Sequence, residues 1–121
     1  HLKRFILLSI PSVPYLEATL LLHSDPAKIW DFKEILRRLY LDDASGEILL
    51  AELKAGGIVE MNAHKLSHCR YQPRTKELGQ MIDLLAAIYP KKLVEVSQLI
   101  HSKVHKKAQR IADAFKLRKG A

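Results

Sequence analysis

Histidine and cysteine side chains are the groups in this sequence that suggest chemistry most directly. His64, His68 and Cys69 lie close together, and His101 and His105 are one helical turn apart. Imidazole nitrogen and thiolate sulfur both bind Zn²⁺, but a zinc site needs three or four ligands that converge in a tetrahedron. Neither group has a carboxylate or a second cysteine at a suitable spacing. We therefore expect surface histidines, with no bound metal and no other cofactor.

Cys69 is the only cysteine, so the chain cannot form an internal disulfide. An oxidant-sensing role would require Arg70 or the nearby histidines to stabilise its thiolate. Its position in a predicted strand favours a small core residue instead. A single thiol also fits a reducing compartment, and we expect a cytoplasmic protein.

The sequence shows no motif of a catalytic site. Gly56-Gly57 is followed by Ile58-Val59 and lacks the Lys-Ser/Thr of a phosphate-binding loop. No serine, histidine and aspartate stand in a recognisable nucleophile motif. The apolar segment 5–22 is interrupted by two prolines and a glutamate, which makes it a poor membrane span. We predict neither an enzyme nor a membrane protein.

Charge is distributed unevenly along the chain. Residues 1–62 carry seven Lys/Arg and nine Asp/Glu, whereas residues 63–121 carry thirteen and four, which gives the net charge of +7. A basic second half suggests an anionic partner such as nucleic acid. The alternative is a basic helix that is simply exposed to solvent.

The elements that must position these residues centre on the segment 25–71. A helix is predicted from Asp43 to Ala55, because Asp43 can accept a hydrogen bond from the first turn and leucines recur every three or four residues. Gly56-Gly57 supplies the positive φ that ends a helix, and residues 58–61 favour a strand. A shorter helix, about Phe32 to Tyr40, precedes it.

Other predicted elements flank this segment. A helix should run from Ser12 to about His23, and Trp30 should fill the core beside the following extended residues. Residues 58–61, a polar tip at 62–65 and a strand near 67–71 should form a hairpin. Thr75 should cap a further helix, which Pro90 ends or kinks. Residues 1–10 fit either a short strand or the end of a helix.

An apolar stripe is predicted along the C-terminal helix. Its members step by three or four residues, namely Leu93, Val96, Ile100, Val104, Ala108, Ile111 and Phe115. The stripe is longer than a small helical core can cover, and an uncovered apolar seam on a helix usually pairs with another copy. We therefore predict a homodimer through Leu93, Val96, Ile100, Val104 and Ile111.

The order of these elements resembles bacterial winged helix-turn-helix regulators of the MarR, ArsR and PadR type. The most specific part is Leu50-x-x-Leu53-x-x-x-Gly57-Ile58-Val59, a pattern common where such recognition helices end. The resemblance implies a mainly α fold with a small β-hairpin, with the winged-helix core at residues 13–89. An N-terminal extension at 1–12 and a basic dimerisation helix at 90–121 would flank it. It also implies a DNA-binding dimer, with the third helix in the major groove and the hairpin, or wing, beside it.

The third predicted helix departs from that pattern in its side chains. Its outward face holds Ala44, Ile48, Ala51, Glu52 and Ala55. A helix that reads bases should offer Arg, Lys, Asn or Gln to their edges. Ser45 and Lys54 are the only DNA contacts we expect from it. An exposed Ile48 among alanines indicates a protein contact instead.

The wing is the more basic surface. His64, Lys65, Arg70 and Arg74 can contact phosphates without reading sequence. Two functions follow as alternatives. One is a DNA-binding transcriptional regulator that gains affinity mainly from the wing and the tail, and the other is a protein-interaction module that uses the face around Ile48.

Overall fold

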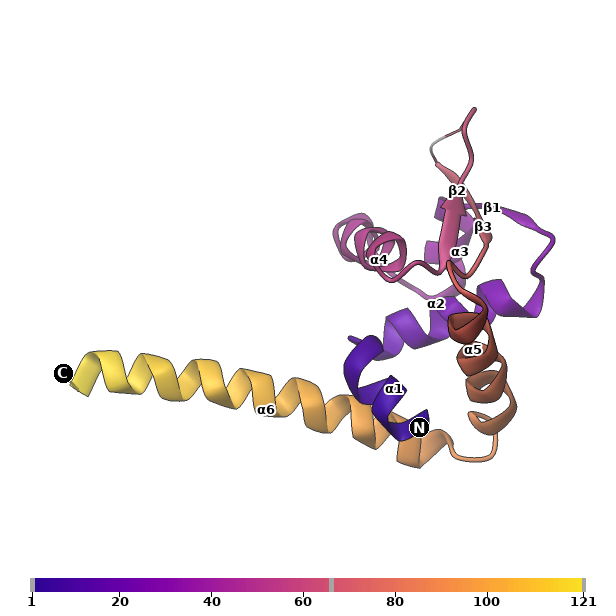
Figure 1. Ribbon diagram of the computed structural model, residues 1–121. Helices are drawn as coiled ribbons and strands as arrows, with labels where there is room; N and C mark the ends of the chain where they lie inside the picture. The colour runs from indigo at the N-terminus through magenta and orange to yellow at the C-terminus, as the bar shows by residue number, and fades with distance from the viewer. Residues whose placement is uncertain (1, 66, 121) are drawn as a thin grey trace.

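The computed structural model describes residues 2–65 and 67–120, and the side chains of residues 2–65 and 67–114. The described elements are α1 (Leu2–Ser9), α2 (Val13–Ser24), β1 (Ile29–Asp31), α3 (Phe32–Arg38), α4 (Asp43–Ala55), β2 (Val59–Met61), β3 (His68–Tyr71), α5 (Lys76–Ile88) and α6 (Leu93–Gly120). The protein is mainly helical with a small antiparallel sheet, as predicted. Figure 1 shows the sheet and its hairpin at one end of the domain, and α6 extending far beyond the other elements.

Polar side chains begin the helices of the domain. Ser12 accepts the Tyr15 N–H at the start of α2, and Thr75 accepts the Leu78 N–H at the start of α5, as predicted. The cap of α4 is Asp42 rather than Asp43, since the Asp42 Oδ1 accepts the Ser45 N–H at 2.7 Å. The sequence offers two adjacent aspartates, and only the one with extended backbone can turn its carboxylate back onto the first turn.

The sheet has the strand order β1-β3-β2, with both neighbouring pairs antiparallel. Cys69 on the central strand pairs with Trp30 on one side and with Met61 on the other. Trp30 and Cys69 are buried, so this row faces the core. The predicted hairpin and the predicted place of Trp30 are both confirmed.

Gly57 makes the connection between α4 and the sheet. Its φ is +71°, the left-handed conformation that glycine adopts without steric cost. The Ile58 N–H then donates to the Leu53 carbonyl, and the Ile58 side chain is buried. The exit of α4 therefore leads straight into β2.

Residues 2–12, which lie in the segment 1–12 expected to be an extension, are part of the packed domain. Residues 2–9 form α1, and the buried side chains of Ile6 and Ile10 belong to the main core. Helix α1 packs against α5 and against the start of α6. The apolar residues of this segment therefore join α1 to α5 and to the start of α6.

Candidate nucleic-acid interface

Helix α4 is held by one face and exposes the other. Leu49 and Leu53 are buried in the core, and Gly46 lies so close to Leu36 that a Cβ there would come within 2.5 Å of the leucine Cδ1. The outward face contains Ile48, which is 64% exposed, as predicted. Exposed alanines surround it, namely Ala44, Ala51 and Ala55.

The exposed side of α4 carries negative charge. Asp42, Asp43 and Glu47 are exposed, and Glu52 is half-buried. Hydrogen bonds from Ser45 hold the pKa of Asp42 below its usual value, so this carboxylate is ionised at neutral pH. These acids stand where a major-groove helix would meet phosphates, and like charges repel.

Two predicted DNA contacts lie on this helix. Ser45 is exposed, but its backbone N–H is already bonded to Asp42. Lys54 is exposed in the last turn, and its carbonyl accepts a hydrogen bond from Arg74 Nη2 at 3.4 Å. The predicted residues Lys54 and Arg74 are thus brought together, because this hydrogen bond holds the Arg74 guanidinium at the end of α4.

The tip of the hairpin presents the predicted residues His64 and Lys65. Both side chains are exposed, and the Asn62 Oδ1 accepts the backbone N–H of each, at 2.8 and 3.1 Å. An asparagine side chain that bonds two following N–H groups fixes a tight turn. The tip therefore holds the positively charged Lys65 on a defined turn.

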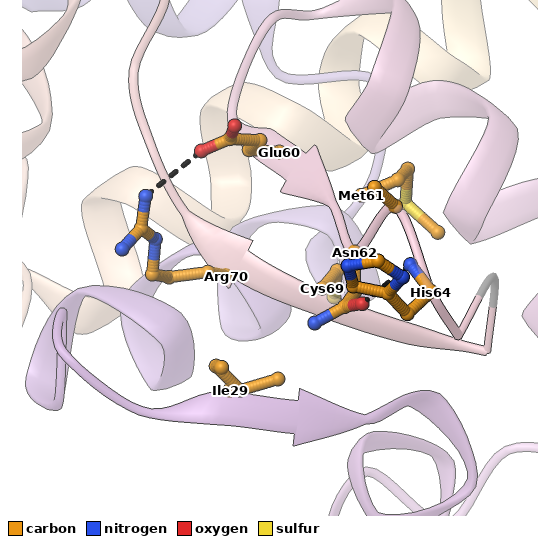
Figure 2. Close-up of a pocket in the computed structure, with 8 residues that line it drawn as sticks. Ile29, Glu60, Met61, Asn62, His64, Cys69 and Arg70 are labelled. Carbon is orange, nitrogen blue, oxygen red and sulfur yellow. Dashed lines mark hydrogen bonds and ion pairs between the residues drawn. The ribbon is translucent and has the colours of Figure 1, made fainter.

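Arg70 does not present a free charge. Its Nη2 donates to the Glu60 Oε2 at 2.9 Å across the β2–β3 pair, as Figure 2 shows. The pair borders a shallow pocket of about 260 Å³, lined also by Ile29, Met61, Asn62 and others. Because Glu60 already neutralises the guanidinium, Arg70 is a weaker phosphate contact than the sequence suggested.

The histidines and Cys69 do not converge on a metal. Among the described residues, no group of three or more His, Cys, Asp or Glu side chains could hold an ion. Cys69 is buried, and burial raises the pKa of its thiol to about 11. A thiol that stays protonated near neutral pH is a poor nucleophile, which favours the core role over oxidant sensing.

The predicted dimerisation stripe divides into two parts. Val96 and Ile100 are only 3% and 1% exposed, because α1 covers them within the same chain. The expectation that nothing in the chain buries these two residues is therefore wrong. Leu93, Val104 and Ile111 remain about half exposed, at 50%, 47% and 53%. The Phe115 side chain lies outside the described residues.

Lys103 is a structural residue that the sequence did not reveal. Its Nζ donates to the carbonyl oxygens of Leu7 at 3.0 Å and Ile6 at 3.5 Å, and also to that of Ile10. Ile6 and Leu7 lie in the last turn of α1, where a helix attracts cations, and the Ile6 carbonyl also accepts the Ile10 N–H at 3.2 Å. Only the packing of α6 on α1 brings together residues so far apart in sequence.

Comparison with known proteins gives no relative. No family model, no curated protein and no solved structure matches this chain. No single described helix has the length and apolarity to cross a membrane; α1 and α2 pass that test only together, and the chain bends by 116° between them.

Proposed function

We propose that this chain is a winged helix-turn-helix domain that binds DNA through its backbone, with little reading of sequence. The observation that carries the proposal is the order α2-β1-α3-α4-β2-β3 combined with the antiparallel sheet order β1-β3-β2. In this arrangement α4 leads directly into a hairpin that projects from the domain (Figure 1). Proteins of this architecture commonly place these two elements against a duplex.

The side chains favour the hairpin over α4 as the point of contact. Lys65 stands on a turn fixed by Asn62 and is exposed. Lys54 and Arg74 are exposed near the point where α4 ends and the hairpin begins. Apart from Ser45, the remainder of the α4 surface is apolar or acidic. Contacts of this kind position a duplex without distinguishing its bases.

Fluorescence anisotropy on random and defined duplexes across a salt series tests this proposal. Phosphate contacts release counterions, so affinity should fall steeply with salt and vary little with sequence. Lys65→Gln should weaken binding and lower the salt slope by about one. Arg70→Gln should do less, because Glu60 already pairs with that residue.

Lys3→Gln is the matched control, since α1 lies at the end of the domain opposite the hairpin (Figure 1). It removes the same charge and should leave affinity nearly unchanged. Glu52→Gln should leave binding equal or slightly stronger. Tight binding to one sequence that survives high salt would contradict the proposal, and so would absence of binding at low salt.

A second candidate function is a protein-interaction module on the same scaffold. Ile48, exposed between alanines on α4, favours it. Ile48 and these alanines form one continuous apolar strip, and exposed apolar patches mark contact surfaces.

A further inference from the structure

Two exposed helix faces in this chain match each other in shape and charge. The first is the α4 strip, defined as Ala44, Ile48, Ala51 and Ala55 with Glu47 and Glu52 at its sides. The second is the α6 strip, defined as Val104, Ala108 and Ile111 with Lys107 and Arg110 along one side. We propose that the α6 strip of one copy docks on the α4 strip of a second copy, and the reverse, in a two-fold dimer.

The shapes of the two strips are complementary. Val104, Lys107, Ala108 and Ile111 have the spacing i, i+3, i+4 and i+7, which is the four-residue hole that receives a side chain from a facing helix. Ile48 is a single large side chain surrounded by alanines, and therefore a suitable knob. The small residues of both strips allow the helix axes to approach to about 8 Å.

The lengths also agree. Helix α4 has 13 residues, which corresponds to about 20 Å at 1.5 Å per residue. The described part of α6 from Val104 to Ala114 covers about 16 Å by the same measure. Every side chain from residue 104 to residue 114 is exposed. One strip can therefore cover most of the other.

Charge favours this partner over a second α6. Glu47 and Glu52 border the α4 strip, whereas Lys107 and Arg110 border the α6 strip, so the proposed contact places opposite charges side by side. Pairing two copies of α6 would instead bring basic residues together. Asp113, the acidic residue of this part of α6, already accepts a hydrogen bond from Gln109 at 3.0 Å.

The contact must join two molecules. Val96 and Ile100 fix the first turns of α6 against α1, and Lys103 bonds the end of α1 immediately before the strip begins. The helix continues unbroken through residues 104–114, so the strip cannot turn back to its own α4. Each copy has one α4 strip and one α6 strip. A two-fold axis therefore produces two equivalent contacts, and all four strips are covered.

The proposal does not depend on DNA binding. The proposed dimer explains why the α4 surface is apolar and acidic, because this surface binds the basic α6 helix of the second copy. Nucleic acid would then reach the hairpin while α4 stays covered. Absence of DNA binding would remove the proposed function and leave this contact intact, and absence of the dimer would do the opposite.

Charge exchange between two variants tests the contact. The α4 variant carries Glu47→Lys and Glu52→Lys, and the α6 variant carries Lys107→Glu and Arg110→Glu. In a heterodimer of the two variants both contacts regain opposite charges, whereas each homodimer has like charges in both. Analytical ultracentrifugation at low salt measures the sedimenting mass, which is 13.8 kDa for one chain.

The wild-type chain should sediment at twice that mass. Each variant alone should sediment as a monomer, and their equimolar mixture should return to the dimer. Recovery in the mixture also shows that both variants are folded. A wild-type monomer, an α4 variant that remains dimeric, or a mixture that stays monomeric would each overturn the proposal. An α4 variant that remains dimeric would point to pairing of two α6 helices.

Disulfide trapping gives a second, independent measurement. In a Cys69→Ala background, a copy with Ile48→Cys is mixed with a copy with Ala108→Cys under mild oxidation. The mixed disulfide should form faster than either homodimeric disulfide. Preferential formation of the Ala108→Cys homodimer would refute the assignment.

Discussion

Removal of the Lys103 ammonium should loosen the junction between α1 and the first half of α6. The Lys103 Nζ donates to three carbonyls at the end of α1, and α1 contributes Ile6 and Ile10 to the core. Lys103→Met keeps most of the aliphatic stem and removes the charge and all three donors. The substitution therefore isolates the polar contact from the packing of the stem.

The magnitude follows from the chemistry and the exposure of the site. A hydrogen bond to a charged group contributes about 1.5–3 kcal/mol when well buried. Lys103 is half-buried, so water screens the charge and can replace part of the lost bonding. We expect a loss of about 1–2 kcal/mol in the free energy of unfolding, which corresponds to a decrease in Tm of about 5 °C.

Urea denaturation followed by fluorescence measures this loss, since Trp30 is the only tryptophan and is buried in the core. The midpoint should fall while the m-value stays constant. Lys106→Met is the matched control, because it removes the same charge from an exposed position three residues later and outside the α6 strip. Equal stability of the two variants at one protein concentration would refute the proposed role of Lys103.

Three further outcomes are expected. Asp42→Ala should destabilise the fold, whereas Asp42→Asn should retain the cap. Because the folded pKa of Asp42 is depressed, the stability that its carboxylate contributes is present at neutral pH and is lost as the pH falls through that pKa. Thermal melts of Asp42→Asn should therefore be less sensitive to acid than those of the wild type. Cys69 should react slowly with a thiol reagent near neutral pH and rapidly in urea, because burial raises its pKa to about 11; fast reaction of the folded protein would show that the thiol is accessible. Gly46→Ala should cost about 1 kcal/mol of stability, because the new methyl group crowds Leu36, and the cost should shrink in a Leu36→Ala background. An additive double mutant in urea melts would contradict that contact.

The helices and strands were largely predictable because their signals are local. Ser12 and Thr75 begin helices with side chains that reach N–H groups three residues away. Gly57 ends α4 because it can adopt positive φ, and the apolar residues after it continue as a strand. Each signal acts within one or two turns of chain, so a linear sequence is enough to read it.

The candidate site was predicted less well because its charges depend on neighbours from other strands and helices. Arg70 was expected to contact phosphate, yet the β2–β3 register places Glu60 opposite it. Arg74 was expected at the wing, and the structure joins it to the end of α4. Residue type gives the charge of a side chain, whereas the pairing of the strands decides whether that charge is neutralised.

Helix α6 shows most clearly which features the sequence predicted and which the tertiary structure decided. The sequence by itself predicted a helix with an apolar stripe from Leu93 to Phe115, because periodicity is a property of the order of residues, and this segment lies within α6. Only the tertiary structure decided that α1 covers Val96 and Ile100 and leaves Val104 and Ile111 exposed. The physical reason is that burial depends on which segment packs against a face, and α1 lies about a hundred residues earlier in the chain and is too short to cover the whole helix.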